Sequence, residues 1–327
     1  MSERTEKFAR NTALEALLGS LNSRLEPAGD AISSGFSRPE FPVCLIVGSA
    51  RSGTTLFLQW LARTGLFCYP SNFISRFFVA PCIGLQIQKM LLDDRLAFGQ
   101  ELGGARLEAF GSNLGKTTGW LEPNEFWYFW RRFFTDSTDQ SSVEFTNRKR
   151  LIADLAALES EARQPLAMKA MIANWWIEEL DRLLNKVVFV HLRRDVRYTA
   201  QSLLEARKTH SGSVSNWYSF KTPGFGRLKK LDPISQVVGQ VLETQRAVDE
   251  SLNKLNPDRY LVLEYEDFCV RPEDAYIQLK SRYEAQGHTG FPATCPILGP
   301  FKVENECRME GEDWQNLTSL IEQSIKG

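Results

Sequence analysis

The stretch from Val43 to Phe57, VCLIVGSARSGTTLF, constrains the fold of this chain more than any other part of the sequence. A short apolar run bounded by turn residues is typical of a strand buried in a parallel sheet, and the apolar spacing after Gly53 predicts a helix. A strand, a glycine-bearing loop and a helix N-terminus together direct free backbone N–H groups and the helix dipole at one point. The sequence therefore predicts a phosphate-binding loop at Gly48–Thr55.

The loop lacks the lysine of the standard nucleoside-triphosphate loop, whose pattern is GxxxxGK followed by Ser or Thr. Thr54 stands at the lysine position, while Arg51, Ser52 and Thr55 offer a guanidinium and hydroxyl donors for an anion. Chemistry at a γ-phosphate, with its magnesium ion, is therefore poorly supported. A strand-to-helix turn with incidental polar residues is the alternative interpretation.

Length, charge and cysteine usage limit the classes of function. The 327 residues are enough for one large α/β domain, and a net charge of −1 argues against nucleic acid as the main partner. The six cysteines form no CxxC pair, so a zinc site is unsupported and a reduced, cytoplasmic chain is expected. No apolar stretch is long enough to predict a membrane span.

The domain organisation follows from composition and periodicity. We expect residues 1–40 to form an amphipathic helix and a linker, the linker being the Gly-, Ser- and Pro-rich segment from Pro27 to Pro42. Residues 41–327 are expected to form a single domain. Its region from about 68 to 164 shows helical patterns and ends in the amphipathic stretch RLIADLAALESEAR, which predicts a helical insertion or cap.

Strands alternate with helices in the rest of the domain. Apolar runs predict further strands at 165–170, 186–192 and 259–265, and helical patterns lie at 174–184, 193–208, 233–255 and 271–287. This alternation predicts an α/β fold with a parallel sheet flanked by helices, whose ligands bind at the carboxyl ends of the strands. The segments that this rule places along one edge are Gly48–Thr55, Lys169–Ala170, Arg193–Asp195 and Tyr265–Asp267.

A second basic segment follows the strand at 186–192. Arg194 stands at the end of that strand, and Ser202 lies about two helical turns further along. Both could reach one anion only if the helix packs back toward the sheet edge. Alone, this segment is typical of a solvated helix start, but together with the loop it indicates a second phosphate site.

These motifs resemble those of sulfotransferases that use 3′-phosphoadenosine 5′-phosphosulfate, of the bacterial type related to tyrosylprotein sulfotransferases. The family's GxxRSGTT loop is matched at Gly48–Thr55, its RDPRxxxxS segment at Arg194–Ser202 with Val196 in place of proline, and its YEDLxxxP segment from Tyr265. The matches extend from Val43 to about Pro272.

The resemblance implies a fold like that of P-loop nucleoside triphosphatases and a donor without a γ-phosphate, with no metal expected. It places the 5′-phosphosulfate on the loop and the 3′-phosphate on Arg194 and Ser202, and it makes Tyr265 a candidate contact of the nucleotide. The loop residues that it implicates are Arg51, Ser52, Gly53, Thr54 and Thr55.

Catalysis would need a cation at the leaving oxygen and a general base for the acceptor hydroxyl. The resemblance assigns the first role to Lys169. The glutamate that the tyrosylprotein branch keeps after its first helix is missing from the comparable stretch YPSNFISRF, so we take Glu122 and Glu125 as candidate bases. His191 and His210 are reserves. The alternative is that the two glutamates only begin a helix, where acids favour the dipole.

The two glutamates stand in the aromatic stretch WLEPNEFWYFWRRFF. Such a run is typical of core or of a subunit contact in a homo-oligomer, and it could also line an apolar or sugar-bearing acceptor. The sequence thus favours sulfuryl transfer to a hydroxyl of a small molecule, lipid or glycan, with specificity set by the insertion and the C-terminal segment. A magnesium-dependent phosphotransferase or nucleoside triphosphatase, and a noncatalytic nucleotide-binding protein, are the alternatives.

Overall fold

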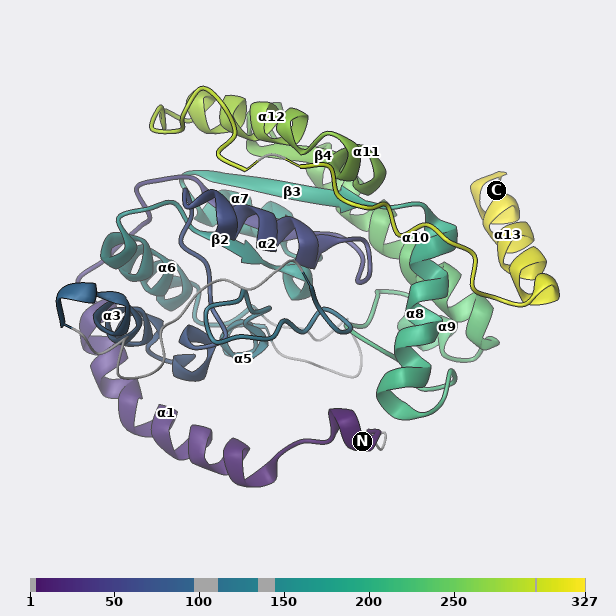
Figure 1. Ribbon diagram of the computed structural model, residues 1–327, viewed down its shortest axis with the longest axis horizontal. Helices are drawn as coiled ribbons and strands as arrows, with labels where there is room; N and C mark the ends of the chain where they lie inside the picture. Colours follow the sequence, from purple (N-terminus) through teal and green to yellow (C-terminus); the bar gives the residue numbers. More distant parts are fainter. Residues whose placement is uncertain (1–3, 97–110, 135–144, 298, 327) are drawn as a thin grey trace.

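Four parallel strands form the central sheet of the computed structural model, which describes residues 4–96, 111–134, 145–297 and 299–326. In the order β2-β1-β3-β4, neighbouring strands pair in parallel, and helices cover both faces (Figure 1). The strands are β1 (Val43–Val47), β2 (Ala167–Lys169), β3 (Val187–Arg193) and β4 (Tyr260–Glu264). The predicted α/β fold with a parallel, helix-covered sheet is confirmed.

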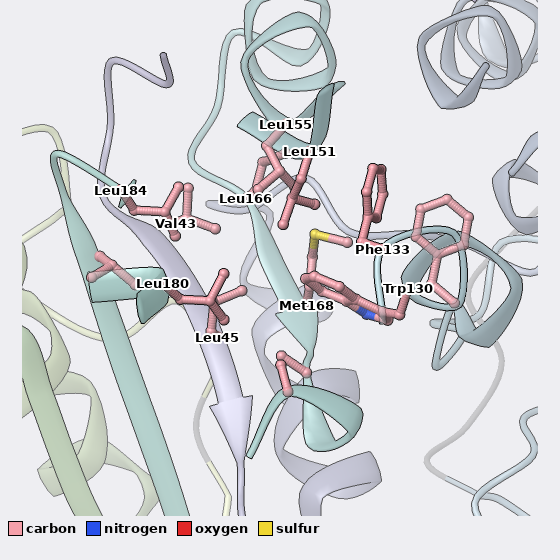
Figure 2. Close-up of a cluster of buried hydrophobic side chains, with 14 of the residues drawn as sticks. Val43, Leu45, Trp130, Phe133, Leu151, Leu155, Leu166, Met168, Leu180 and Leu184 are labelled. Carbon is pink, nitrogen blue, oxygen red and sulfur yellow. The ribbon is translucent and has the colours of Figure 1, made fainter. Parts of the chain in front are cut away.

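One face of the sheet packs on helices from both halves of the chain. Val43 and Leu45 of β1 lie beside Leu180 and Leu184, and Met168 of β2 lies beside Trp130 and Phe133 (Figure 2). The elements on this side are α5 (Trp127–Trp130), α6 (Arg148–Ala162), η5 (Met171–Ala173), α7 (Ile177–Leu183) and α10 (Pro233–Leu252).

The opposite face is covered by α2 (Thr54–Thr64), α11 (Tyr265–Val270) and α12 (Pro272–Ala285). Because side chains alternate along a strand, Cys44 and Ile46 of β1 point to this side, where they pack with Trp60 of α2. Gly65 caps the end of α2, and its φ of 70° is in the left-handed region that glycine favours. Burial on both faces explains why β1 and β3 read as continuous apolar runs.

A third group of helices stands beyond the carboxyl ends of the strands. It consists of α8 (Val196–Ser211), α9 (Phe225–Leu228), α10 and α13 (Gly311–Lys326), while η6 (Pro257–Arg259) leads into β4. The C-terminal segment runs from α12 past α11 to α13, which lies beside α8 and α10 (Figure 1). Within the described ranges, no helix is both long enough and apolar enough to cross a membrane.

The region between α2 and β2 contains η2 (Ile74–Phe77), α3 (Pro81–Leu92), η3 (Asp94–Leu96), α5 and α6. The aromatic run is mostly core, because five of its rings are buried in the cluster under the sheet: Phe126, Phe129, Trp130, Phe133 and Phe134. These rings are therefore not available for a subunit contact. Tyr128 is the exposed member of the run, at 45%.

The linker prediction is wrong in its first part. η1 (Glu6–Phe8) precedes α1 (Thr12–Ser33), which continues through Pro27. Tertiary contacts hold the last turns: Gly29 lies so close to Val79 that a β-carbon would be 2.7 Å from its carbonyl oxygen, and Ser33 Oγ donates to Asp154. This packing outweighs the cost of an interior proline, and the linker shortens to residues 34–42.

The prediction that α6 is amphipathic is also wrong, since every residue from 151 to 159 is buried. Its two buried acids have specific partners. Asp154 accepts hydrogen bonds from Ser33 and Arg132, and Glu159 accepts from the backbone N–H groups of Glu40 and Phe41. A helix between the sheet, α1 and α3 has no solvent-facing side here, so its polar residues need internal partners.

Candidate functional site

The loop after β1 has the geometry of an anion-binding loop. The N–H of Gly48 donates to Asn174 Oδ1 (2.9 Å), and the Asn174 amide donates back to the Gly48 carbonyl (2.9 Å), which fixes the start of the loop. Gly53, with φ of 93°, immediately precedes α2. In the described part of the chain, the backbone N–H groups from Ser49 to Leu56 have no hydrogen-bond acceptor. They are free to bind an anion at the N-terminus of α2.

Only glycine fits at position 53. A β-carbon there would lie 2.4 Å from the ring of Tyr265, which follows β4 and packs directly against the loop. The guanidinium of Arg194 stands 4.9 Å from the centroid of the same ring. Tyr265 is thus in contact with both predicted anion-binding segments, and its burial raises the pKa of the phenol to about 12.

Helix α8 packs back against the loop, which was the condition for a second anion site. The Nε of Arg51, a residue with φ of 71°, donates to Ser202 Oγ (3.0 Å). Arg194 Nη1 donates to the Arg51 carbonyl (3.1 Å). Asp195 accepts from the Arg197 N–H and caps α8, so that Val196 occupies the first helical position, where a proline would also fit.

The C-terminal segment contacts Arg194. The Arg194 side chain donates to Asn305 Oδ1 (2.9 Å) and to the Glu304 carbonyl. Burial, together with Arg51 and Arg308 nearby, lowers the pKa of Arg194. Glu304 and Asn305 of this segment thus lie beside Arg194, the residue predicted to bind the 3′-phosphate.

Lys169, at the end of β2, lies at the centre of a small polar cluster. Its Nζ donates to Thr55 Oγ1 (3.0 Å) and forms an ion pair with Glu125. The second oxygen of Glu125 accepts from the indole N–H of Trp127. The side chain of Lys169 is only 4% exposed. A cation from the neighbouring strand therefore stands beside the loop that has Thr54 in place of lysine.

The structure separates the two candidate bases. Glu122 is 1% exposed and is held on the side of α2, where it pairs with Arg63 (2.8 Å) and accepts from Gln59 (3.0 Å). Of the reserves, His191 lies in β3 and is fully buried, with Nδ1 3.0 Å from Asp249. His210, at the end of α8, packs against the rings of Phe8 and Tyr218.

A tight turn that the sequence did not indicate lies over the cluster. Asn113 and Lys116 pair through both backbone hydrogen bonds, and Gly115 between them has φ of 83°. A β-carbon on Gly115 would be 3.3 Å from both Glu125 Oε1 and Thr55 Oγ1. The hydroxyl of Tyr218 donates to the carbonyl of the turn residue Leu114 (3.1 Å).

Sequence reasoning missed four residues around the site: Asn174, Asn305, Gly115 and Tyr218. Asn174 could have been suspected, because it follows the strand that ends at Lys169 and the ends of parallel strands share an edge. The other three come from segments without a recognisable motif. Their placement depends on contacts between residues far apart in the chain.

The arrangement can bind two anions and move a proton. The loop N–H groups and Arg51 form one positive centre, and Arg194 with Ser202 forms a second beside it. The cluster of Lys169 and Glu125 adjoins the first centre through Thr55. No group of three or more His, Cys, Asp or Glu residues suited to a metal ion occurs within the described ranges.

Comparisons with known proteins show the family of this chain and its likeness to solved structures. A family model described as "Sulfotransferase family" matches residues 42–281. Among solved structures, the chain is similar to the sulfotransferase STF9 from Mycobacterium avium, with 13% identity, a TM-score of 0.50, and coverage of 92% of this chain and 72% of that chain. It is also similar to the sulfotransferase STF1 from Mycobacterium tuberculosis H37Rv, with 12% identity, a TM-score of 0.48, and coverage of 82% and 72%. No curated protein matches the sequence.

Proposed function

The chain belongs to the sulfotransferase family, and we propose that it transfers a sulfuryl group from 3′-phosphoadenosine 5′-phosphosulfate to a hydroxyl of a small molecule, lipid or glycan. One observation carries the proposal beyond the family. Two positive centres, at the loop and at Arg194 with Ser202, meet through Arg51 at the carboxyl edge of the sheet. A donor with phosphates on both its 3′ and its 5′ oxygens has the charge pattern that such a pair would bind.

The donor-binding residues act in two groups. The loop N–H groups, Arg51 and the hydroxyl of Thr55 bind the 5′-phosphosulfate at the start of α2. Ser52, Gly53 and Thr54 contribute their backbone N–H groups, because the hydroxyls of Ser52 and Thr54 donate to the Ser49 carbonyl and to Met171 Sδ. Arg194 and Ser202 bind the 3′-phosphate. Tyr265 packs against Gly53 and Arg194 and thereby holds the two groups at a fixed distance.

The transfer step uses the polar cluster. The oxygen of the acceptor hydroxyl forms a bond to sulfur, and Glu125 accepts the proton that this hydroxyl loses. At the same time the bond between sulfur and the bridging phosphate oxygen breaks, and its electron pair stays on the phosphate. Lys169 stands between Thr55 and Glu125, so its ammonium group can stabilise the charge that grows on the leaving oxygen. The carboxylate retains lone pairs for the acceptor proton beside its bonds to Lys169 and Trp127.

Glu125 suits the role of base better than Glu122. Glu125 contacts the same lysine that contacts Thr55 of the loop, whereas Glu122 is held by Arg63 and Gln59 on the side of α2. A base must reach the proton that it removes. We therefore assign Glu122 a structural role and keep Glu125 as the catalytic residue.

The compartment and the partners belong to the proposal as well. All six cysteines are free thiols, and five of them are buried, which suits a reducing compartment such as the cytoplasm. We propose a small-molecule, lipid or glycan acceptor and no nucleic acid, in keeping with the net charge of −1.

The test is calorimetric binding of adenosine 3′,5′-bisphosphate without metal, compared with ATP plus Mg²⁺. We expect the bisphosphate to bind and the Ser202→Ala variant to weaken it about tenfold, the value of one hydrogen bond to a charged group. Arg194→Ala should also weaken binding of the bisphosphate. Arg193→Ala is its matched control, because Arg193 pairs with Glu264 and Asp249 and does not contact the loop.

Two outcomes would contradict the proposal. Preference for ATP with Mg²⁺ would indicate a phosphotransferase or nucleoside triphosphatase. Bisphosphate binding without any turnover of the phosphosulfate donor, over a broad set of alcohols and phenols, would indicate a noncatalytic nucleotide-binding protein.

A further inference from the structure

A cationic corner, formed by Arg4, Lys116 and His210, surrounds the buried ring of Phe8. Lys116 Nζ lies 5.1 Å from the centroid of that ring, and the His210 ring lies 5.4 Å from it. The N–H of Thr5 donates to the His210 carbonyl (3.0 Å), which brings the neighbouring Arg4 to the same place. The N-terminal segment thus completes a group of basic side chains from three distant parts of the chain.

The cationic corner lies directly beside the proposed transfer centre. Lys116 follows Gly115, where a β-carbon would be 3.3 Å from Glu125 Oε1. His210 is 5.4 Å, ring to ring, from Tyr218, whose hydroxyl donates to the Leu114 carbonyl of the same turn. One turn therefore has the carboxylate of Glu125 on one side and the cationic corner on the other.

Among the described residues, no carboxylate forms an ion pair with the basic side chains of the cationic corner, and Glu125 acts on Lys116 only from a longer distance. Throughout the ranges that the structure describes, neither Arg4, Lys116 nor His210 makes a side-chain ion pair or hydrogen bond. Burial and then Arg4 lower the pKa of Lys116, and burial, Arg4 and Lys116 lower the pKa of His210. Arg4 and Lys116 carry like charges that repel each other, and an anion placed between them would relieve that repulsion, whereas the lowered pKa of His210 disfavours its charged form.

The nearest carboxylate does not relieve it. Glu125 already forms an ion pair with Lys169 and accepts from Trp127, and it is the group that the acceptor hydroxyl must reach. Within the described ranges, Glu125 is the carboxylate that acts on these basic groups, so an anionic group of a ligand would meet no other competing carboxylate of those ranges at the cationic corner. In the proposed function, the ligand whose hydroxyl reaches Glu125 is the acceptor.

We propose that the acceptor carries an anionic group, which the cationic corner binds while the acceptor hydroxyl faces Glu125. The inference rests on the proposed function and narrows its acceptor to anionic alcohols or phenols.

The experiment uses 3-(4-hydroxyphenyl)propanoate as the probe and its amide as the uncharged control. Binding of each is measured by calorimetry to the full chain saturated with adenosine 3′,5′-bisphosphate. We expect the carboxylate to bind at least tenfold more tightly than the amide, and Lys116→Ala to remove most of that difference. Lys116→Arg should keep it, and Lys230→Ala, which removes an exposed lysine elsewhere, should leave it unchanged.

The outcomes separate this inference from the function on which it rests. If the wild type binds the bisphosphate but binds the two probes equally, or binds neither, the anionic-acceptor proposal is overturned and the donor site stands. If the bisphosphate itself does not bind, the proposed function fails and the inference fails with it. Arg4→Ala provides a second variant at an exposed position, so a folding defect in the Lys116 variant cannot decide the result.

Discussion

At the scale of single residues, Lys169 supplies a cation beside a loop that has Thr54 where a nucleoside-triphosphate loop has lysine. A nucleoside-triphosphate loop carries its cation within the loop itself, whereas here the cation comes from the adjacent strand β2. The register pairs Lys169 with Ile46, two residues before the loop begins, so the lysine side chain is at the right height to reach Thr55. The short strand β2 thus positions the proposed catalytic lysine with backbone hydrogen bonds.

The two glutamates give a first prediction. Glu125→Gln should lower kcat by about 10²- to 10⁴-fold, because the proton acceptor is lost, with bisphosphate binding retained. Glu122→Gln should instead lower the free energy of unfolding by about 3–5 kcal/mol, since it leaves the largely buried Arg63 without its carboxylate. Steady-state kinetics and urea unfolding of both variants check this assignment. If Glu122→Gln loses turnover and Glu125→Gln keeps it, the two roles are reversed.

The turn over the cluster gives a second prediction. Gly115→Ala adds a β-carbon against Glu125 and Thr55, so it should reduce kcat/KM by at least tenfold. Gly65→Ala is the matched control, because Gly65 also has positive φ but a β-carbon there would meet nothing within 4 Å. Both variants should lose about 1 kcal/mol of stability from backbone strain. Equal activity of the two variants would show that the turn does not approach the reacting groups.

At the scale of elements, α8 decides whether two anion sites exist or one. Its capped N-terminus follows β3, and its first turns bring Ser202 to Arg51. Contacts with α10 and α13 hold α8 in that direction. The helix therefore links the second anion site to the packing of the group of helices beyond the sheet.

Helix α6 gives a prediction about pH. Burial raises the pKa of Glu159 from 4.5 to about 7. The folded chain therefore holds a proton that the unfolded chain releases, and the free energy of unfolding should fall as pH rises from about 4.5 to about 7. We expect this carboxyl to contribute about 1–3 kcal/mol to that fall.

Glu159→Gln should flatten the corresponding part of the stability curve, because the amide oxygen can still accept from Glu40 and Phe41 but does not titrate. Urea unfolding of both proteins at several pH values measures the difference, in which titration of the other groups cancels. An unchanged slope in the variant would show that Glu159 is ionised in the folded chain throughout this range.

At the scale of the whole molecule, the two ends of the chain close opposite sides of the site. The N-terminal segment reaches the end of α8 through Thr5, next to the cationic corner. The C-terminal segment reaches Arg194 through Glu304 and Asn305, on the side of the proposed donor. Residues separated by most of the sequence thus border one edge of the sheet.

This arrangement predicts that the C-terminal segment affects donor binding alone. Asn305 accepts from Arg194 and donates to Glu266, and it thereby holds the Arg194 guanidinium in position. Asn305→Ala should remove this support and weaken bisphosphate affinity about tenfold. Calorimetry measures the affinity, and the anionic probe used above should bind the saturated enzyme as before. If Asn305→Ala binds the anionic probe more weakly and its bisphosphate affinity is unchanged, this segment belongs to the acceptor side instead.

The sequence by itself determined the sheet, the loop and the candidates for the site. Continuous apolar runs predict strands buried on both faces, and the parallel alternation with helices places their carboxyl ends along one edge, where the loop, Lys169 and Arg194 are found. Local patterns suffice there because each depends on neighbours within a few residues. The family resemblance was readable for the same reason.

Only the tertiary structure decided which candidates meet. Glu122 and Glu125 are only three residues apart in the sequence, yet they contact different partners. The chain around them, which includes Phe126 with its positive φ and the turn at Gly115, follows a path that depends on long-range packing. The same holds for Pro27, which lies inside a helix because α1 packs on its neighbours. Contacts between distant segments carry no local signal, so the choice between the two candidate bases, the turn over Glu125 and the basic groups beside it could be recognised only in the folded chain.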